Sequence, residues 1–99
     1  MNRIRVKNDG NKISIAIQGD FTFDLNREFR ETYQSCPAGA QFEIDLRQSD
    51  YMDSAGLGML LQLRDYAGGD SARVTITGAN ETIRSVLEVA NFHKLFTIR

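Results

Sequence analysis

The stretch YMDSAGLGMLLQLRDYAGG, residues 51–69, sets an acid and a serine ahead of two glycines and a run of leucines. Its spacing predicts a helix that begins at Ser54. Because each residue turns a helix by about 100°, one arc collects uncharged side chains that we expect to face a sheet: Met59, Leu60, Leu63, Tyr66 and Ala67. Leu57 and Leu61 fall on another arc, together with Ser54 and Gly58. These two leucines form either a docking surface beside Ser54 or an ordinary part of the surface or core.

Strand patterns lie on both sides of this helix. Apolar residues alternate with charged or small ones in residues 4–6 and again in residues 13–17. The Asp9-Gly10 pair between these segments favours a turn, so we expect the two strands to form a hairpin. Further strands are predicted at residues 42–46 and 74–77, with a short one at 96–98.

Two more helices are predicted between the strands. The first has an apolar residue at every fourth position: Leu25, Phe29 and Tyr33. Thr22 or Asp24 is expected to cap its start, and Pro37 prevents its continuation. The other follows a cap at Asn80 and stops near Asn91, with apolar residues at helical spacing: Ile83, Val86, Leu87 and Ala90.

The order of these elements predicts an α/β fold with a mixed sheet of four to five strands and crossover helices. Ninety-nine residues can bury one core, so we expect a single domain over residues 1–99. The composition, 41% hydrophobic and 25% charged, is typical of a soluble globular domain. Dispersed charges argue against direct binding to nucleic acid. No apolar stretch approaches the ~20 residues needed to span a bilayer, so we expect a cytoplasmic protein with neither a membrane segment nor a signal peptide.

Ser54 allows three kinds of chemistry. Its hydroxyl could cap the helix by accepting a hydrogen bond from an amide of the first turn, and the residues by themselves favour this structural role. A phosphate on the hydroxyl would meet the same amides and would add charge close to Asp50 and Asp53. A catalytic serine would need a nearby base, and the nucleophile-elbow pattern lacks its first glycine here. His93 is better explained as a surface or loop-packing residue than as that base.

The remaining polar and small residues are given structural interpretations. Gly56 and Gly58 do not follow a phosphate-loop pattern and are predicted to permit close contact between the backbone and a neighbour. Three acids stand around a helix start, where negative charge favours the dipole more readily than it forms an acid–base or metal site: Asp20, Asp24 and Glu28. Cys36 is expected to pack at a helix end, because one Cys and one His cannot assemble a structural zinc site. We therefore predict no catalytic residue, metal or cofactor.

Two segments resemble the STAS domain of anti-sigma factor antagonists. They are DLRQSDYMDSAGLG, residues 45–58, and the Gly19-Asp20-Phe21 triplet after the second strand. The resemblance covers nearly the whole chain, and its most specific part is a strand ending in Asp-Leu followed by Asp-Ser-x-Gly-Leu. It implies a single STAS domain, a mixed sheet with helices packed against it.

The resemblance also implies a role for Ser54. In this family the matching serine is phosphorylated by a protein kinase, often the anti-sigma factor itself, and dephosphorylated by a PP2C-like phosphatase. The unphosphorylated form binds the anti-sigma factor and frees the sigma factor, whereas the phosphorylated form lets go. Two departures stand out: Ala55 replaces a second serine, and Thr22 replaces an acid that often continues the early signature.

These expectations combine into a non-enzymatic protein that switches partners when Ser54 is phosphorylated. The residues expected to bind the anti-sigma factor or serine kinase are Asp20, Asp53, Ser54, Leu57, Gly58 and Leu61. The alternative is a STAS subunit of a transporter or signalling scaffold in which Ser54 is never modified. A hydrolase comes third, because the sequence supplies no base for Ser54.

Overall fold

The computed structural model describes residues 3–99, and its centre is a five-stranded mixed sheet. The strands lie side by side in chain order: β1 (Ile4–Asp9), β2 (Lys12–Gln18), β3 (Gln41–Gln48), β4 (Val74–Thr77) and β5 (Thr97–Ile98). β1 pairs with β2 antiparallel, whereas each later pair of neighbours is parallel. The predicted hairpin is confirmed, and its turn contains Gly10 at φ 71°, which glycine adopts without strain. The predicted strands are all present, although the last begins at Thr97 rather than Phe96.

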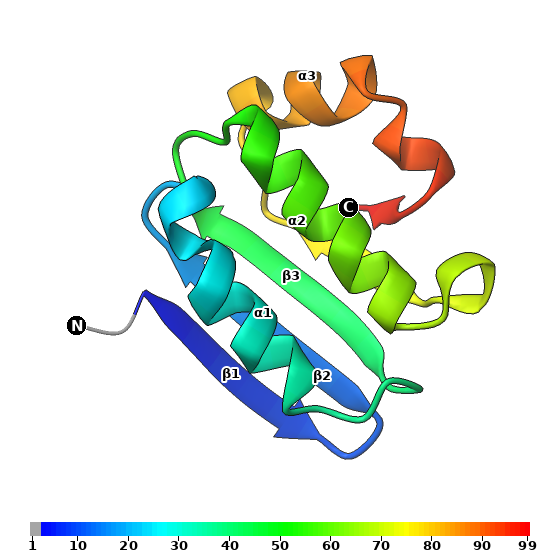
Figure 1. Ribbon diagram of the computed structural model, residues 1–99. Coiled ribbons are helices and arrows are strands. Elements are labelled where there is room, and N and C mark those ends of the chain that lie inside the picture. The colour runs from blue at the N-terminus through cyan, green and yellow to red at the C-terminus, as the bar shows by residue number, and fades with distance from the viewer. Residues whose placement is uncertain (1–2) are drawn as a thin grey trace.

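Three helices connect the parallel strands: α1 (Asn26–Gln34), α2 (Ser54–Tyr66) and α3 (Glu81–Val89). Each helix joins one strand to its next neighbour in the sheet, so the crossovers all advance in the same direction. Because such crossovers are right-handed, the helices gather on one face of the sheet. Figure 1 shows α1 and α2 lying across that face, with α3 beyond α2. The predicted α/β fold is therefore confirmed.

The core lies between the sheet and these helices. Alternate residues of the central strands are almost completely buried there: Ile13, Ile15, Ile17, Phe42, Ile44, Leu46, Val74 and Ile76. The arc of α2 predicted to face the sheet is also buried, apart from half-buried Tyr66. Aromatic rings join α1 to α2, because the Tyr33 ring centroid lies 5.4 Å from that of Phe29 and 5.3 Å from that of Tyr66. In residues 3–99 no helix covers the other face of the sheet (Figure 1).

The capping residue predicted for α3 is confirmed, whereas the caps predicted for α1 are not found. Asn80 caps α3, because its Oδ1 accepts a hydrogen bond from the Ile83 amide at 2.8 Å. Neither Thr22 nor Asp24 caps α1, so that prediction is wrong. A 3-10 turn, η1 (Phe23–Leu25), precedes the helix, and the Thr22 hydroxyl donates to the Asp24 carboxylate without accepting a hydrogen bond from a backbone amide.

Two further features bear on the functional classes. No helix within residues 3–99 is long and apolar enough to cross a bilayer. The same part of the chain contains no group of three or more His, Cys, Asp or Glu side chains placed to hold a metal ion. Cys36 is half-buried just after α1, where its Sγ contacts the Thr32 carbonyl oxygen at 3.5 Å, so its predicted packing at a helix end is confirmed.

Candidate functional site

Asp53, and not Ser54, caps α2. The Asp53 backbone is extended, and its Oδ1 accepts a hydrogen bond from the Gly56 amide at 3.0 Å. Ser54 is the first residue of the helix, so the prediction that its hydroxyl is the cap is wrong. A capping side chain comes from the residue just before the first turn, and here that residue supplies a carboxylate. The Ser54 hydroxyl is therefore not needed to start α2.

The Ser54 side chain is exposed at the N-terminal end of α2, where an enzyme could reach it. A phosphate there would lie beside backbone amides of the first turn and at the positive end of the helix dipole. The fold could therefore accept the modification without unfolding. The neighbouring carboxylates are exposed Asp50 and half-buried Asp53, so a phosphate would add to charge of the same sign.

The loops that follow β2 and β3 meet beneath the start of α2. The Phe21 amide donates to the Tyr51 carbonyl at 2.9 Å, and Phe21 forms a parallel bridge with Met52. Because β2 and β3 are parallel, both loops leave the same edge of the sheet. Exposed Asp20 is thus brought to the end of the molecule that carries Ser54.

Of the two glycines in α2, Gly56 permits a close contact. A Cβ on Gly56 would lie 2.8 Å from the Phe21 carbonyl oxygen and 2.6 Å from Cγ of Met52. A Cβ on Gly58 would have no neighbour within 4 Å in the described part of the chain. The prediction of close contact is confirmed for Gly56 and wrong for Gly58, which instead leaves part of the exposed side of α2 without a side chain.

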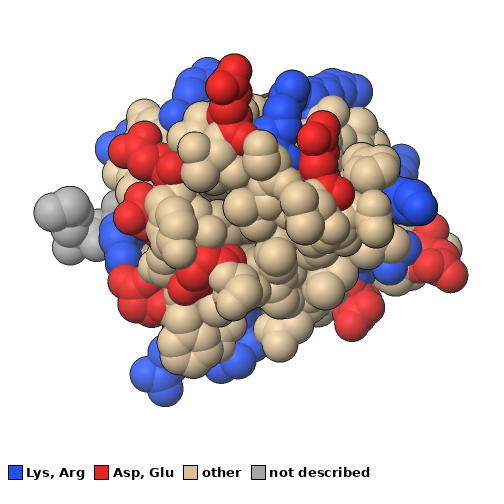
Figure 2. All heavy atoms as spheres, turned by 90° about the horizontal axis from the view of Figure 1, so that it is seen from above, with Lys and Arg blue, Asp and Glu red and all other residues tan. Residues whose placement is uncertain are grey.

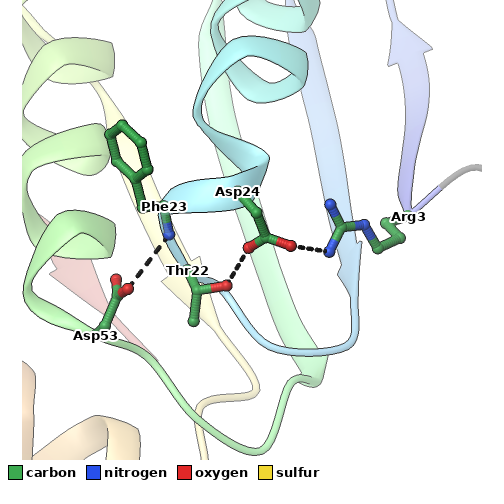
Figure 3. Close-up of polar contacts among 5 residues, drawn as sticks. All are labelled: Arg3, Thr22, Phe23, Asp24 and Asp53. Carbon is green, nitrogen blue, oxygen red and sulfur yellow. Dashed lines mark hydrogen bonds and ion pairs between the residues drawn. The ribbon is translucent and has the colours of Figure 1, made fainter.

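Asp53 also holds a second segment in place. While its Oδ1 caps α2, its Oδ2 accepts a hydrogen bond from the Phe23 amide at 3.3 Å, the contact drawn in Figure 3. The Phe23 side chain is 66% exposed. A large aromatic ring held in water next to Ser54 is a candidate anchor for a partner. Strand and helix patterns did not single out Phe23, because they do not report exposure in a short 3-10 turn.

Asp24 lies on the other side of the same turn. Its carboxylate accepts the Thr22 hydroxyl and pairs with Arg3, Nη1 to Oδ2, at 2.7 Å (Figure 3). The hydrogen bond from Thr22, followed by that from Arg3, holds the pKa of Asp24 below its ordinary value. Thr22 therefore stabilises the charged form of a neighbouring acid.

Leu57 lines an apolar groove beside α3. The groove has a volume of ≈ 330 Å³, and its other lining residues come from α3 and the position after it: Ser85, Val86, Val89 and Ala90. Val89 is 86% exposed, and Leu61, one turn after Leu57, is 38% exposed. Leu57 itself is half-buried against the core. Neither leucine is a core residue, so the core interpretation is wrong, and docking stays a prediction beside the ordinary-surface alternative. The sequence patterns missed Val89, whose neighbours in α3 face the core.

Exposed and half-buried apolar side chains extend from Ser54 along α2 to the groove beside α3, next to acidic ones. We call the group the Ser54 surface: Phe23, Tyr51, Ser54, Leu57, Leu61 and Val89. Figure 2 views this end of the molecule and shows acidic side chains concentrated at the left, beside a broad area without charge. Exposed acids at this end are Asp20, Asp24 and Asp50. A complementary protein would be apolar at its centre and basic at one side.

His93 lies far from Ser54. It is exposed in a 3-10 turn before β5 and lines a hollow together with Gln41 and Arg73, at the beginnings of β3 and β4. Ser54 follows the other end of β3. The two side chains therefore stand at opposite edges of the sheet, and His93 cannot act as a base for Ser54.

Comparison with known proteins identifies the family. The family described as Mlab, STAS domain matches residues 4–97. The chain is a STAS-domain protein. A STAS-domain containing protein of Pseudomonas aeruginosa (strain UCBPP-PA14) is 40% identical over 91 residues, covering 91% of this chain and 90% of that relative. The resemblance carried by Asp-Ser-x-Gly-Leu is therefore confirmed at the level of the family.

Solved structures share the STAS fold. A Thermotoga maritima protein proposed to be an anti-sigma factor antagonist superposes with a TM-score of 0.84 at 13% identity, over 96% of this chain and 84% of its own. The anti-sigma factor antagonist SpoIIAA, in its unphosphorylated form, superposes with a TM-score of 0.73 at 15% identity, over 97% and 86% of the two chains. These likenesses establish the five-stranded mixed sheet with three helices as a STAS fold.

Proposed function

We propose that this STAS domain is an anti-sigma factor antagonist that works by phosphorylation-controlled partner switching. With Ser54 unphosphorylated, the Ser54 surface binds an anti-sigma factor or serine protein kinase, and phosphate on Ser54 releases it. The observation that carries the proposal is the placement of Ser54. It is exposed, it does not cap α2, and half-buried Leu57 and exposed Leu61 follow it on the same arc of the helix.

The partner contacts follow from this surface. Leu57 and Leu61 are one turn apart on α2 and share an arc with Ser54, so all three can touch one partner surface. Gly58 carries no side chain there and allows the partner to approach the helix backbone. Asp20 and Asp53 would face basic groups of the partner at the acidic side. Phe23 and Val89 supply further apolar contact.

Release by phosphate has a physical basis. A phosphoserine carries about −1.5 to −2 charges at neutral pH, and here it would stand beside Asp50 and Asp53. Burying that charge against an apolar partner surface costs several kcal/mol unless cations compensate it. Phosphorylation would therefore remove the partner while α2 keeps its Asp53 cap.

Because Ser54 is exposed, a phosphate on its hydroxyl would also be accessible for removal by a phosphatase. A PP2C-like phosphatase is the proposed enzyme that restores the binding form. The direct output is a protein–protein contact, so the proposal requires neither a bound nucleic acid nor catalysis by this chain.

The first test is the intact mass of the protein isolated from its native cells. We expect wild type to carry one phosphate that is absent from Ser54→Ala. The matched control is Ser85→Ala, because Ser85 is another exposed serine and lines the groove beside Leu57. This variant should keep the phosphate. If neither resting nor stressed cells yield the adduct, the alternative of a non-phosphorylated transporter or scaffold subunit replaces this function.

The second test is affinity for the anti-sigma factor that co-purifies with Ser54→Ala. We expect phosphorylated wild type to bind it about 100-fold more weakly than the unphosphorylated protein, given the charge and desolvation of the phosphate. Equal affinity of the two forms would contradict partner switching.

A further inference from the structure

The face of the sheet opposite the helices is exposed and carries an ordered pattern of charge. Its two hollows, of ≈ 540 and ≈ 130 Å³, are lined by side chains of β1, β2 and β3. The strand register aligns these side chains into rows that cross the three strands. Arg5 of β1 pairs with Ala16 of β2, which pairs with Asp45 of β3.

The next row repeats this order. Lys7 pairs with Ser14, which pairs with Glu43. These two rows therefore have a cation on β1, a small residue on β2 and a carboxylate on β3, whereas the row beyond them (Asp9, Lys12 and Gln41) does not. Within residues 3–99, neither Arg5 nor Lys7 forms an ion pair, so the cationic edge of this face has no partner in its own chain.

We propose that this open face binds a second copy of the same chain. A two-fold axis lying above β2 and along it exchanges the β1 and β3 sides while preserving position along the strands. Arg5 of each copy then faces Asp45 of the other, and Lys7 faces Glu43. In these two rows the face is thus complementary to itself, as a symmetric dimer requires.

The side chains at the centre suit such a contact. Of the β2 residues beneath the axis, Ser14 and Ala16 are small, so the two sheets can approach there to about 10 Å, the usual distance between packed sheets, while the longer Lys12 stands at the beginning of the strand. Long Arg and Lys side chains can span that gap. The carboxylates are already held in position, since Glu43 pairs with Lys12 at 3.3 Å and Asp45 Oδ1 accepts the Arg47 amide at 2.9 Å.

The size of the face sets the strength of the dimer. Three strands about 4.8 Å apart and six residues long give a contact of roughly 15 by 20 Å, which is below the usual size of a stable interface. We therefore expect a weak, reversible and salt-sensitive dimer. In it, both copies of α2 point outward, so both Ser54 surfaces stay accessible and the inference is independent of the proposed function.

The test is sedimentation equilibrium of the full chain from about 10 μM to about 1 mM, at about 0.05 M and about 0.5 M salt. Wild type should dimerise reversibly, and less at high salt. Lys7→Glu and Glu43→Lys should each weaken dimerisation by about tenfold, because each replaces two symmetric attractions by repulsions. Far-UV circular dichroism of the variants confirms that they remain folded.

Mixing the variants gives the sharpest result. In a mixed dimer, Glu at position 7 of one copy faces Lys at position 43 of the other, while the second pair keeps its native charges. Adding unlabelled Glu43→Lys to amino-terminally labelled Lys7→Glu should therefore form mixed dimers, so that the labelled protein sediments as a dimer. The control partner is Glu88→Lys, which makes an equal charge change at an exposed position of α3. Added in place of Glu43→Lys, it should form mixed dimers with labelled Lys7→Glu about tenfold less tightly. A monomeric wild type at about 1 mM and low salt, or a dimer unaffected by either substitution, would overturn the proposal.

Discussion

Gly56 is the residue at which the start of α2 touches the loop that follows β2. Any Cβ at this position would overlap the Phe21 carbonyl oxygen, which belongs to the backbone and cannot turn aside as a side chain can. We expect Gly56→Ala to lower the free energy of unfolding by about 1–3 kcal/mol, the usual penalty for overpacking. Urea denaturation followed by circular dichroism measures it.

Gly58 provides the matched control two residues along the same helix. It is exposed, and an added Cβ has no neighbour within 4 Å among the described residues. Gly58→Ala should therefore raise the free energy of unfolding by about 0.5–1 kcal/mol, since alanine favours a helix interior. Destabilisation by both substitutions would show that overlap at Gly56 is not the cause. A loss of partner affinity in the stabilised Gly58→Ala would support close approach of the partner there.

At the scale of elements, the start of α2 depends on one carboxylate with two roles. Asp53 caps the helix through Oδ1 and holds the Phe23 turn through Oδ2. Asp53→Ala removes both acceptors and should lower the free energy of unfolding by about 1 kcal/mol, whereas Asp53→Asn keeps an oxygen acceptor and should lose less. Thermal unfolding measures the difference. Equal stability of the alanine variant and wild type would show that the cap contributes nothing.

At the scale of the whole molecule, buried Tyr33 links stability to alkaline pH. Burial raises the pKa of Tyr33 above its ordinary value, because the folded protein disfavours the tyrosinate. This contribution to stability is fully present below the unfolded pKa of about 10 and is lost as pH rises through the folded pKa. We expect wild type to lose more stability than Tyr33→Phe between about pH 8 and about pH 11, as measured by urea midpoints.

Comparing wild type with Tyr33→Phe isolates the effect of the Tyr33 hydroxyl. The other ionisable groups are common to both proteins, and phenylalanine preserves the ring contacts with Phe29 and Tyr66. Parallel pH profiles for the two proteins would show that Tyr33 ionisation does not limit alkaline stability.

Much of the fold was predictable because its signals are local. Alternation in residues 13–17 and 42–46 reports which side chains face a core, and β2 and β3, whose alternate residues are buried, contain these segments. Asn80 carries its own cap signal, and the structure bears it out. The Asp-Ser-x-Gly-Leu segment identified the family. The roles of Ser54 and its neighbours in binding a partner remain predictions.

The sequence by itself thus determined the strands, the helices, the buried arc of α2 and the STAS family, since each depends on residue type and short-range spacing. The tertiary structure alone decided that Asp53 caps α2, because the choice between adjacent residues depends on backbone angles. It also exposed Phe23 beside Asp53 and Val89 beside Leu57, put His93 at the opposite edge, and left one face of the sheet open. These features depend on how distant segments meet once the crossovers pack every helix on one side, and no local spacing encodes that meeting.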